Sequence, residues 1–294
     1  MKRTSIAIVL SFIAVASASH TSAAPFTGSY IQNFDSMGTA GTAAPTGWIE
    51  YSLAGSHDDY RHAGSTAAIT TTFLPSAFPD TINNADGTST TRALTTNATL
   101  TAATPSNQRA AGGFNFGLAA SPSDRALGTS PTGVGACELE LQLTNNSGAA
   151  ISSLSVGYDI RCFSTTVDAN GYTTSPDAGA EEFPGYWLFY SLDNGSTWTN
   201  VSSLNPTRTG PGGIIVPNSI GVTNVPATTI ALGSAWTDGA NLRFRWFDDN
   251  AQSPSPDQLL GLDNVAINTV PEPATISLFA GASALLALRR RSVR

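Results

Sequence analysis

Residues 137–143 have the sequence CELELQL, in which apolar and polar side chains alternate at every position. Successive side chains of a β-strand point to opposite faces, so the cysteine and the three leucines share one face. The two glutamates and the glutamine share the other face. The stretch therefore predicts a half-buried strand and an all-β fold.

A second alternating stretch, LSVGYDIRC at residues 154–162, follows the turn-like sequence NNSG at 145–148. The two stretches are predicted to pair as an antiparallel hairpin. If Cys137 lies opposite Cys162, the apolar residues of both strands fall on one face, which is the arrangement that a shared core requires.

Further short alternating runs bounded by turn residues are predicted as strands at 29–35, 47–52, 111–117, 186–192, 197–204, 225–232, 241–247 and 260–268. Long stripes of helical period are absent. About ten strands without helices predict an antiparallel two-sheet sandwich of jelly-roll type over residues 25–269. Residues 54–108, rich in Ser, Thr and Asn, are expected to form long loops with a strand or two.

Residues 1–24 have the organisation of a secretory signal peptide: two basic residues, an apolar stretch expected to be helical, and then small residues. Cleavage is expected after Ala18, Ala23 or Ala24. The proline that follows Ala24 makes the last of these sites less suitable. The chain is therefore expected to be exported.

Residues 270–294 form a second targeting segment, which begins with the sequence Val270-Pro271-Glu272-Pro273. Each proline fixes φ and lacks an N–H, so this step interrupts regular structure and exposes an extended recognition site. The apolar run at 274–288 would span about 22 Å as a helix, short for a permanent anchor. It ends in Arg289-Arg290-Arg291, which would stay on the cytoplasmic side. A buried core helix is the alternative, but a core helix seldom ends in consecutive arginines.

This order of motifs resembles the PEP-CTERM tail of bacterial exported proteins, which is also labelled the ice-binding protein C-terminal domain. That label says nothing about binding ice. The resemblance implies that an exosortase-type membrane protease cuts near the Pro-Glu-Pro step. It also implies that the short transmembrane helix is inserted only transiently before the protein is released or re-anchored.

Short motifs lie at 113–117, 123–128, 143–145, 242–246 and 261–265, and Tyr190-Ser191 occurs together with Trp198. With these motifs, the body of the chain resembles exported bacterial β-sandwich domains that accompany cell-surface sorting tails. Its closing strand is similar to those of lectin-like and adhesion jelly rolls. This resemblance implies no defined reaction and no catalytic residues.

The charge balance excludes nucleic-acid binding as the expected function. Six of the fourteen basic residues lie in the two terminal segments, which leaves eight arginines against twenty-one carboxylates. The exported part therefore has a net charge of −13, or −12 if Glu272 is removed with the tail. Nucleic-acid binding requires a basic face, whereas this charge suits a soluble extracellular protein.

The two cysteines are the only ones in the chain. Because exported proteins meet oxidising conditions, a disulfide between Cys137 and Cys162 is one hypothesis, and two buried thiols that never pair is the other. A structural zinc site is not expected, because it requires four ligands.

Catalytic motifs are sparse, and we expect no enzyme. His57 and His62 lie in the polar sequence SHDDYRH, which is more simply a solvated loop. A glycoside hydrolase needs two facing carboxylates. Glu138 and Glu140 lie two apart on one strand face, at a spacing that does not exclude them, and Glu181-Glu182 lie in a loop-like sequence. A secreted carbohydrate-active hydrolase is therefore the alternative function.

Two binding functions are also considered. Calcium prefers oxygen ligands, and Asp248, Asp249 and Asp263 could converge if the strands before and after residues 249–258 are neighbours. Polysaccharide binding needs exposed aromatic rings, and the candidates are Trp48, Tyr51, Tyr60, Tyr186, Trp187, Trp198, Trp236 and Trp246. Together with the resemblances, these features predict a structural, adhesive or glycan-binding protein of the cell surface or extracellular polysaccharide matrix.

Overall fold

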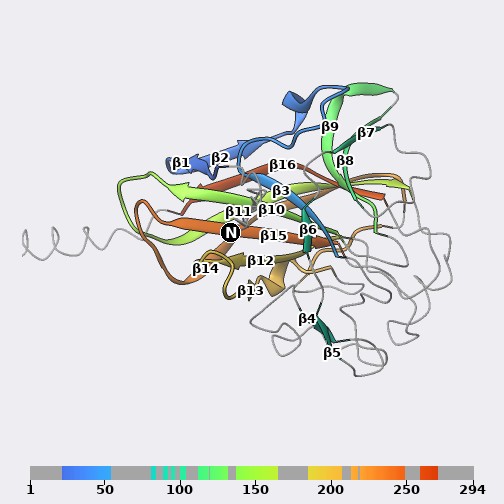
Figure 1. Cartoon of the computed structure of the whole chain (residues 1–294). Coiled ribbons are helices and arrows are strands. Elements are labelled where there is room, and N and C mark those ends of the chain that lie inside the picture. Colours follow the sequence, from blue (N-terminus) through green and yellow to red (C-terminus); the bar gives the residue numbers. More distant parts are fainter. Residues whose placement is uncertain are drawn as a thin grey trace, which may run out of the picture.

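The computed structural model describes residues 22–53, 81–83, 89–91, 94–96, 100–103, 112–118, 120–131, 137–164, 185–206, 213–217, 219–248 and 259–270. These residues form two mixed β-sheets that pack face to face (Figure 1). The prediction of a two-sheet sandwich is confirmed, but the sheets are not purely antiparallel, because residues 24–26 pair in parallel with 143–145, and 101–103 with 114–116. Within the described ranges, no helix has the length and apolar character needed to cross a membrane.

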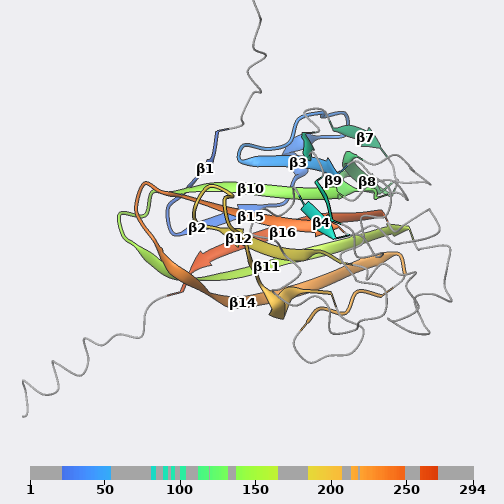
Figure 2. The same cartoon turned by 60° about the horizontal axis from the view of Figure 1, so that its bottom comes forward.

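The first sheet contains seven strands. In spatial order they are β13 (Thr199–Asn200), β12 (Trp187–Ser191), β15 (Asn241–Asp248), β10 (Cys137–Asn145), β3 (Trp48–Leu53) and β6 (Leu94–Thr96), and β1 (Ala24–Phe26) pairs with β10 in parallel. Figure 2 shows β3, β10, β15 and β12 following one another across this sheet. The strand β10, from which the fold class was predicted, thus lies inside the sheet between β15 and β3.

The second sheet also contains seven strands. In spatial order they are β14 (Gly221–Trp236), β11 (Ile151–Ser164), β16 (Leu259–Thr269), β9 (Ser121–Thr129), β8 (Gly113–Leu118) and β7 (Thr101–Ala103), and β2 (Ser29–Gln32) pairs with β16. A separate pair, β4 (Thr81–Asn83) with β5 (Ser89–Thr91), makes a small third sheet. From β10 to β12, and again from β14 to β16, the chain alternates between the two large sheets.

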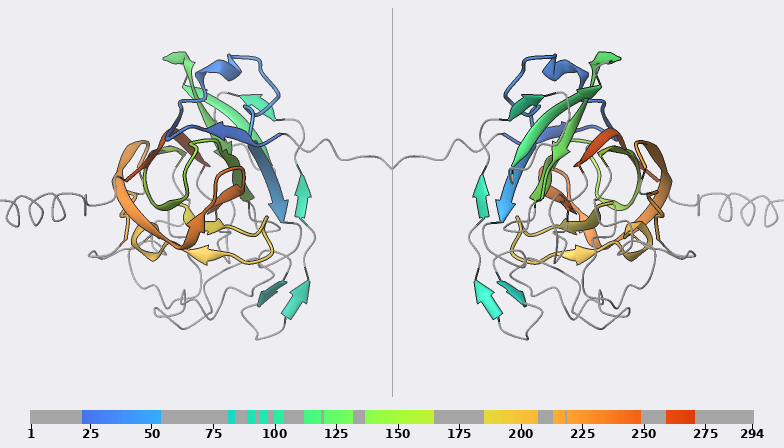
Figure 3. Two further views of the ribbon diagram at one scale, coloured as in Figure 1. Left: turned by 90° about the vertical axis from the view of Figure 1, so that its left-hand side faces the viewer. Right: turned by 90° about the vertical axis from the view of Figure 1, so that its right-hand side faces the viewer.

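The core lies between the two large sheets, as the end-on views of Figure 3 show. Aromatic rings join the layers: Tyr158 of β11 meets Trp246 of β15 edge-on, with ring centroids 5.9 Å apart. Trp48 of β3 lies 5.4 Å from the same indole. Burial of such large apolar surfaces is the main favourable term in the stability of the sandwich.

The predicted hairpin between residues 137–143 and 154–162 is wrong. Strand β10 belongs to the first sheet and β11 to the second, and neither pairs with the other. Their apolar faces do meet, but across the core rather than side by side. The connection is an arch in which the Asn145 Nδ2 donates hydrogen bonds to the carbonyl oxygens of Ala149 (2.8 Å) and Trp236 (2.9 Å).

This topology separates the two cysteines into different sheets. Both are buried, and no disulfide joins them in the structure. The Sγ of Cys162 donates to the Ser164 carbonyl oxygen at 3.1 Å, and burial raises its pKa to about 11. Burial, together with the nearby Glu50 and Asp248 carboxylates, raises the pKa of Cys137 well above its ordinary value. The register that motivated the disulfide is therefore not the one that the fold adopts.

Two further local predictions need correction. The strand predicted at 197–204 is reduced to β13, and a 3₁₀ turn, η2 (Ser202–Leu204), follows it. The side chains of Asn200 and Asn205 hydrogen-bond each other at 2.8 and 2.9 Å, which closes the chain into this turn. The strand β9 was not predicted, because its sequence SPSDRALGT begins with polar and turn-forming residues.

The position of the first described strand distinguishes the three expected cleavage sites of the signal peptide. Ala24 is buried and begins β1, where it lies opposite Leu143 of β10. Phe26 is fully buried against Trp236, with ring centroids 5.2 Å apart. Of the cleavage sites considered, those after Ala18 or Ala23 leave this strand whole, whereas a cut after Ala24 removes a core residue.

Candidate functional site

The outer face of the first sheet presents a row of charged side chains. In the register of β10 with β15, Glu140 lies opposite Arg245 and Gln142 lies opposite Arg243. The alternation predicted for β10 is confirmed, with its leucines in the core and its glutamates on the opposite face. The prediction that this opposite face is exposed is wrong, because Glu138 and Glu140 are both fully buried.

The Arg245 guanidinium is shared by two carboxylates. Its Nε lies 2.6 Å from Oε2 of Glu140, and one terminal nitrogen lies 3.1 Å from Oε2 of Glu138. The other oxygen of Glu140 lies 3.3 Å from a terminal nitrogen of Arg243 and accepts a hydrogen bond of 2.8 Å from Gln142. Buried charges persist only when they are paired in this way.

Two aromatic rings flank this ion-pair network. The guanidinium carbon of Arg245 lies 4.2 Å from the ring centroid of Trp198 and 5.3 Å from that of Tyr51. Both distances suit cation–π attraction. Burial, followed by the Glu140 charge, raises the pKa of Tyr51 to about 12, so its phenol stays neutral at physiological pH. Both rings are partly exposed, so the network has an aromatic border that is accessible to solvent.

The position of Trp198 is fixed by the turn between β12 and β13. Asn194 and Gly195 both have positive φ, 59° and 90°, as a tight hairpin turn requires. Asp193 accepts hydrogen bonds from the Thr197 backbone N–H at 2.9 Å and the Thr197 hydroxyl at 2.6 Å. Burial opposes the ionised form of Asp193, but these hydrogen bonds outweigh it and lower the pKa to about 2. The Trp198 Nε1 then donates to the Gly195 carbonyl at 3.1 Å, which places the indole beside the turn that joins β12 to β13.

Only two of the predicted glycan-stacking aromatics are accessible among those that the structure describes. The buried ones are Trp48, Tyr186, Trp187, Trp236 and Trp246. Tyr51 and Trp198 remain, and both contact the same arginine. Tyr60 lies outside the described residues.

The arginines of this site were not among the residues singled out from the sequence. A signal was available, because Glu138 and Glu140 are separated by one residue, as are Arg243 and Arg245. On neighbouring antiparallel strands, such patterns place opposite charges side by side. Only the tertiary structure pairs these two strands. Their pairing brings the two glutamates and the two arginines together in one site.

The residues predicted for calcium do not form one site in the described part of the chain. Asp248 ends β15 in the first sheet and Asp263 lies in β16 of the second sheet, so the two strands are not neighbours. Asp248 accepts a short hydrogen bond from Thr129 Oγ1. No group of three or more potential metal-ligating side chains occurs among the described residues, and Asp249 lies outside them. Calcium binding stays a prediction.

Asp263 instead belongs to an ion-pair group on the second sheet. One terminal nitrogen of Arg161 lies 2.5 Å from Asp263 Oδ2 and 2.5 Å from Asp124 Oδ1. Asp263 is buried, whereas Asp124 is largely accessible. Burial raises the pKa of Asp263 to about 6, although the Arg161 charge opposes the shift.

Several predicted site residues lie outside the described part of the chain. They are Pro271, Glu272, Pro273, Arg289, Arg290, Arg291, His57, His62, Glu181 and Glu182. Val270 is described: it follows β16 directly, and its N–H donates to the Ser153 carbonyl at 3.4 Å.

Removal of Arg245 is expected to destabilise the protein strongly. In Arg245→Met, the carboxylates of Glu138 and Glu140 lose their shared counter-charge while buried, which costs about 3 to 5 kcal/mol. Arg243→Met is the matched control, because this side chain is 22% exposed and its contact is longer; we expect a loss of about 1 kcal/mol. Urea unfolding of both variants measures the difference. Equal losses would contradict the central role of Arg245.

The raised pKa of Asp263 predicts a specific pH dependence of stability. Between the ordinary value of 3.8 and about 6, the folded protein holds a proton on Asp263 that the unfolded chain releases. The stabilising contribution of this group is therefore present at acid pH and is lost as pH rises through about 6. Asp263→Asn should remove this decline when unfolding free energies are compared across the range, whereas Asp238→Asn at an exposed position should keep it. An unchanged pH profile in Asp263→Asn would contradict the assignment.

Comparison with known proteins does not place the chain in a family. No protein-family model matches it, and no curated protein sequence is significantly similar to it.

Proposed function

We propose that this chain is an exported, non-catalytic protein of the cell surface or extracellular matrix that binds polysaccharide through the outer face of its first sheet. The observation that carries the proposal is the convergence of Trp198 and Tyr51 on Arg245. These two partly exposed rings border a paired network of carboxylates and guanidinium groups.

The chemistry of this face suits sugars. An aromatic ring offers an apolar surface to the C–H face of a pyranose, and the guanidinium of Arg243, which is 22% exposed, can donate hydrogen bonds to its hydroxyls. Because the buried Arg245 is held by Glu138 and Glu140 and contacts both rings, the stacking surface is fixed before a ligand arrives. Such preorganisation reduces the entropic cost of binding.

A binding function is favoured over the alternative, a carbohydrate-active hydrolase. Glycoside hydrolysis requires one of two carboxyl groups to donate a proton to the leaving group. Here both carboxylates are fully buried and pair with one guanidinium. Neither is therefore placed to donate a proton to the leaving group of a substrate.

The proposed route of export and sorting rests on the sequences of residues 1–24 and 270–294. A signal peptide would deliver the acidic sandwich, which we infer to be of jelly-roll type, across the inner membrane. The Pro-Glu-Pro step begins one residue after Val270, which directly follows β16. Since β16 is hydrogen-bonded to β11, β9 and β2, an exosortase-type protease could cut just beyond it without disturbing the sheet.

Glycan binding is tested on the full chain purified from an exporting host. Polysaccharide pull-downs and a glycan array should show retention without new reducing ends. Trp198→Ala is expected to weaken retention at least about tenfold, because the stacking surface is lost, while Trp198→Phe keeps part of it. Thr237→Ala, at an exposed position of another turn, is the control. Release of reducing ends would favour the hydrolase instead, and absence of retention on every glycan would overturn the proposal.

Sorting is tested separately in the host. Replacement of Pro271-Glu272-Pro273 by three alanines should abolish processing, so that the protein stays at its uncut size in the inner-membrane fraction. Mass spectrometry of fractionated cells measures both size and location. The matched control replaces the three residues Ser292, Val293 and Arg294 beyond the arginine cluster. Normal release of the alanine variant would argue against exosortase-type processing.

A further inference from the structure

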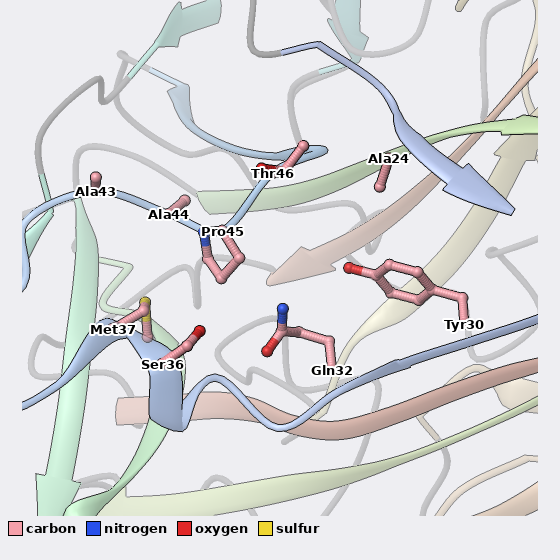
Figure 4. A pocket seen from close by; sticks show the side chains of 9 residues that line it. All are labelled: Ala24, Tyr30, Gln32, Ser36, Met37, Ala43, Ala44, Pro45 and Thr46. Carbon is pink, nitrogen blue, oxygen red and sulfur yellow. The ribbon is translucent and has the colours of Figure 1, made fainter.

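An open groove lies beside the N-terminal strands β1 and β2 (Figure 4), and the charged residues of the first sheet described above are not among its lining residues. Its volume is about 530 Å³, within the range of small-molecule sites. The lining residues are Ala24, Tyr30, Gln32, Ser36, Met37, Ala43, Ala44, Pro45 and Thr46. No sequence motif indicates this groove, because its residues are small or common types.

One wall of the groove is built by an unusual backbone step. Phe34 has φ 60°, a left-handed conformation that is uncommon for a bulky residue, and the 3₁₀ turn η1 (Asp35–Met37) follows it. The Phe34 ring is fully buried edge-on against Trp48, with centroids 5.0 Å apart. The backbone N–H of Phe34 donates to Oε1 of Gln32 at 2.7 Å. These contacts hold both the turn and the Gln32 amide in fixed positions.

The opposite wall is the segment that leads into β3. A turn closes it, in which the N–H of Trp48 donates to the Pro45 carbonyl oxygen at 3.0 Å. Gly47 in this turn has φ 87°, and its carbonyl accepts from the N–H of Gln142 at 2.8 Å. The segment is thereby tied to β10, and the Pro45 ring is directed into the groove (Figure 4).

Polar groups converge inside the groove. Figure 4 shows the Tyr30 hydroxyl, the Gln32 amide and the Ser36 hydroxyl directed towards a common space. The Tyr30 hydroxyl oxygen accepts a hydrogen bond of 2.7 Å from Trp48 Nε1 and interacts with the Gln32 side chain. With its oxygen accepting in this way, the phenol can donate its own proton to a ligand.

Among the residues that the structure describes, the lining contains no carboxylate, no arginine and no histidine. The titratable group in this described lining is Tyr30, whose pKa is raised above 10.0 by burial, so it stays neutral. A charged ligand would be desolvated here without a counter-charge, which is unfavourable. The groove thus combines fixed hydrogen-bonding groups with apolar surfaces from Met37, Pro45 and three alanines, and it has no net charge.

We propose that this groove is a second binding site, distinct from the charged face of the first sheet, for a neutral oligosaccharide of two or three rings. A sugar ring has hydroxyls around its edge and apolar C–H faces, which match the polar and apolar parts of the lining. The volume admits a short oligomer, and the open side lets a longer chain continue into solvent. The site does not depend on the function proposed for the first sheet.

The experiment uses the full chain and the indole N–H signal of Trp48 in ¹H–¹⁵N spectra. This group donates to Tyr30 at the groove, so a ligand that contacts the phenol should shift its signal. The signal is assigned by its displacement in Tyr30→Phe. The probes are cellotriose, maltotriose and triacetylchitotriose, with trigalacturonic acid as the charged comparison. At least one neutral probe should give a saturable shift, and the charged probe should give none.

Three variants make the test specific to the groove. Gln32→Ala and Tyr30→Phe each remove one hydrogen bond to the ligand and should weaken binding about two- to tenfold. Ala43→Trp, at an exposed position of the rim, should block the groove. Ile31→Ala is the matched control: Ile31 lies between Tyr30 and Gln32 on β2, is 75% exposed and points away from the groove, so binding should be unchanged.

The outcomes separate the two proposed sites. Trp198→Ala should leave the Trp48 shift intact, even if polysaccharide retention by the first sheet is lost. The groove proposal is overturned if no neutral probe shifts the Trp48 signal, if the charged probe binds equally well, or if Ile31→Ala weakens binding as much as Gln32→Ala.

Discussion

Two buried carboxylates at the centre of the first sheet pair with one guanidinium, and this pairing constrains how the central strands of the sheet align. Glu138 and Glu140 lie on the outer face of β10, and Arg245 on β15 lies within reach of both. A burial of this kind is tolerated only with close pairing, so the register of β10 with β15 is constrained by electrostatics as well as by the core. A one-residue slip would bring the arginines to the apolar interior.

The same constraint accounts for the contrast between the two faces of the sheet. Inward, β10 and β15 contribute leucines and aromatic rings to a core shared with β11 and β16. Outward, they contribute charges that the rings of Tyr51 and Trp198 border. The first sheet thus stabilises the fold on one side and positions the partly exposed rings of Tyr51 and Trp198 on the other. The neutral groove near β2 has a different origin, since turns and a left-handed residue build it rather than paired strands.

Burial reduces the number of aromatic residues that could stack on a glycan. Eight aromatic residues were candidates for stacking on sugars, and alternation alone could not separate those in the core from those at the surface. In the sandwich, Trp48, Trp236 and Trp246 are fully enclosed, whereas Trp198 is held at the surface by the turn after β12. Among the described residues, the accessible candidate rings are those of Tyr51 and Trp198, and both contact Arg245. This arrangement could not be predicted from a local sequence pattern.

The sequence by itself determined the class of fold, most strand positions, and the inward faces of β10 and β11. These features depend on a two-residue period and on local backbone preferences, which are readable without knowing any neighbour. The tertiary structure alone decided that β10 and β11 face each other across the core, that the two cysteines lie in different sheets, and that Glu140 meets Arg245. Glu140 and Arg245 lie 105 positions apart in the sequence, and an alternating pattern is equally compatible with many partners, near or distant.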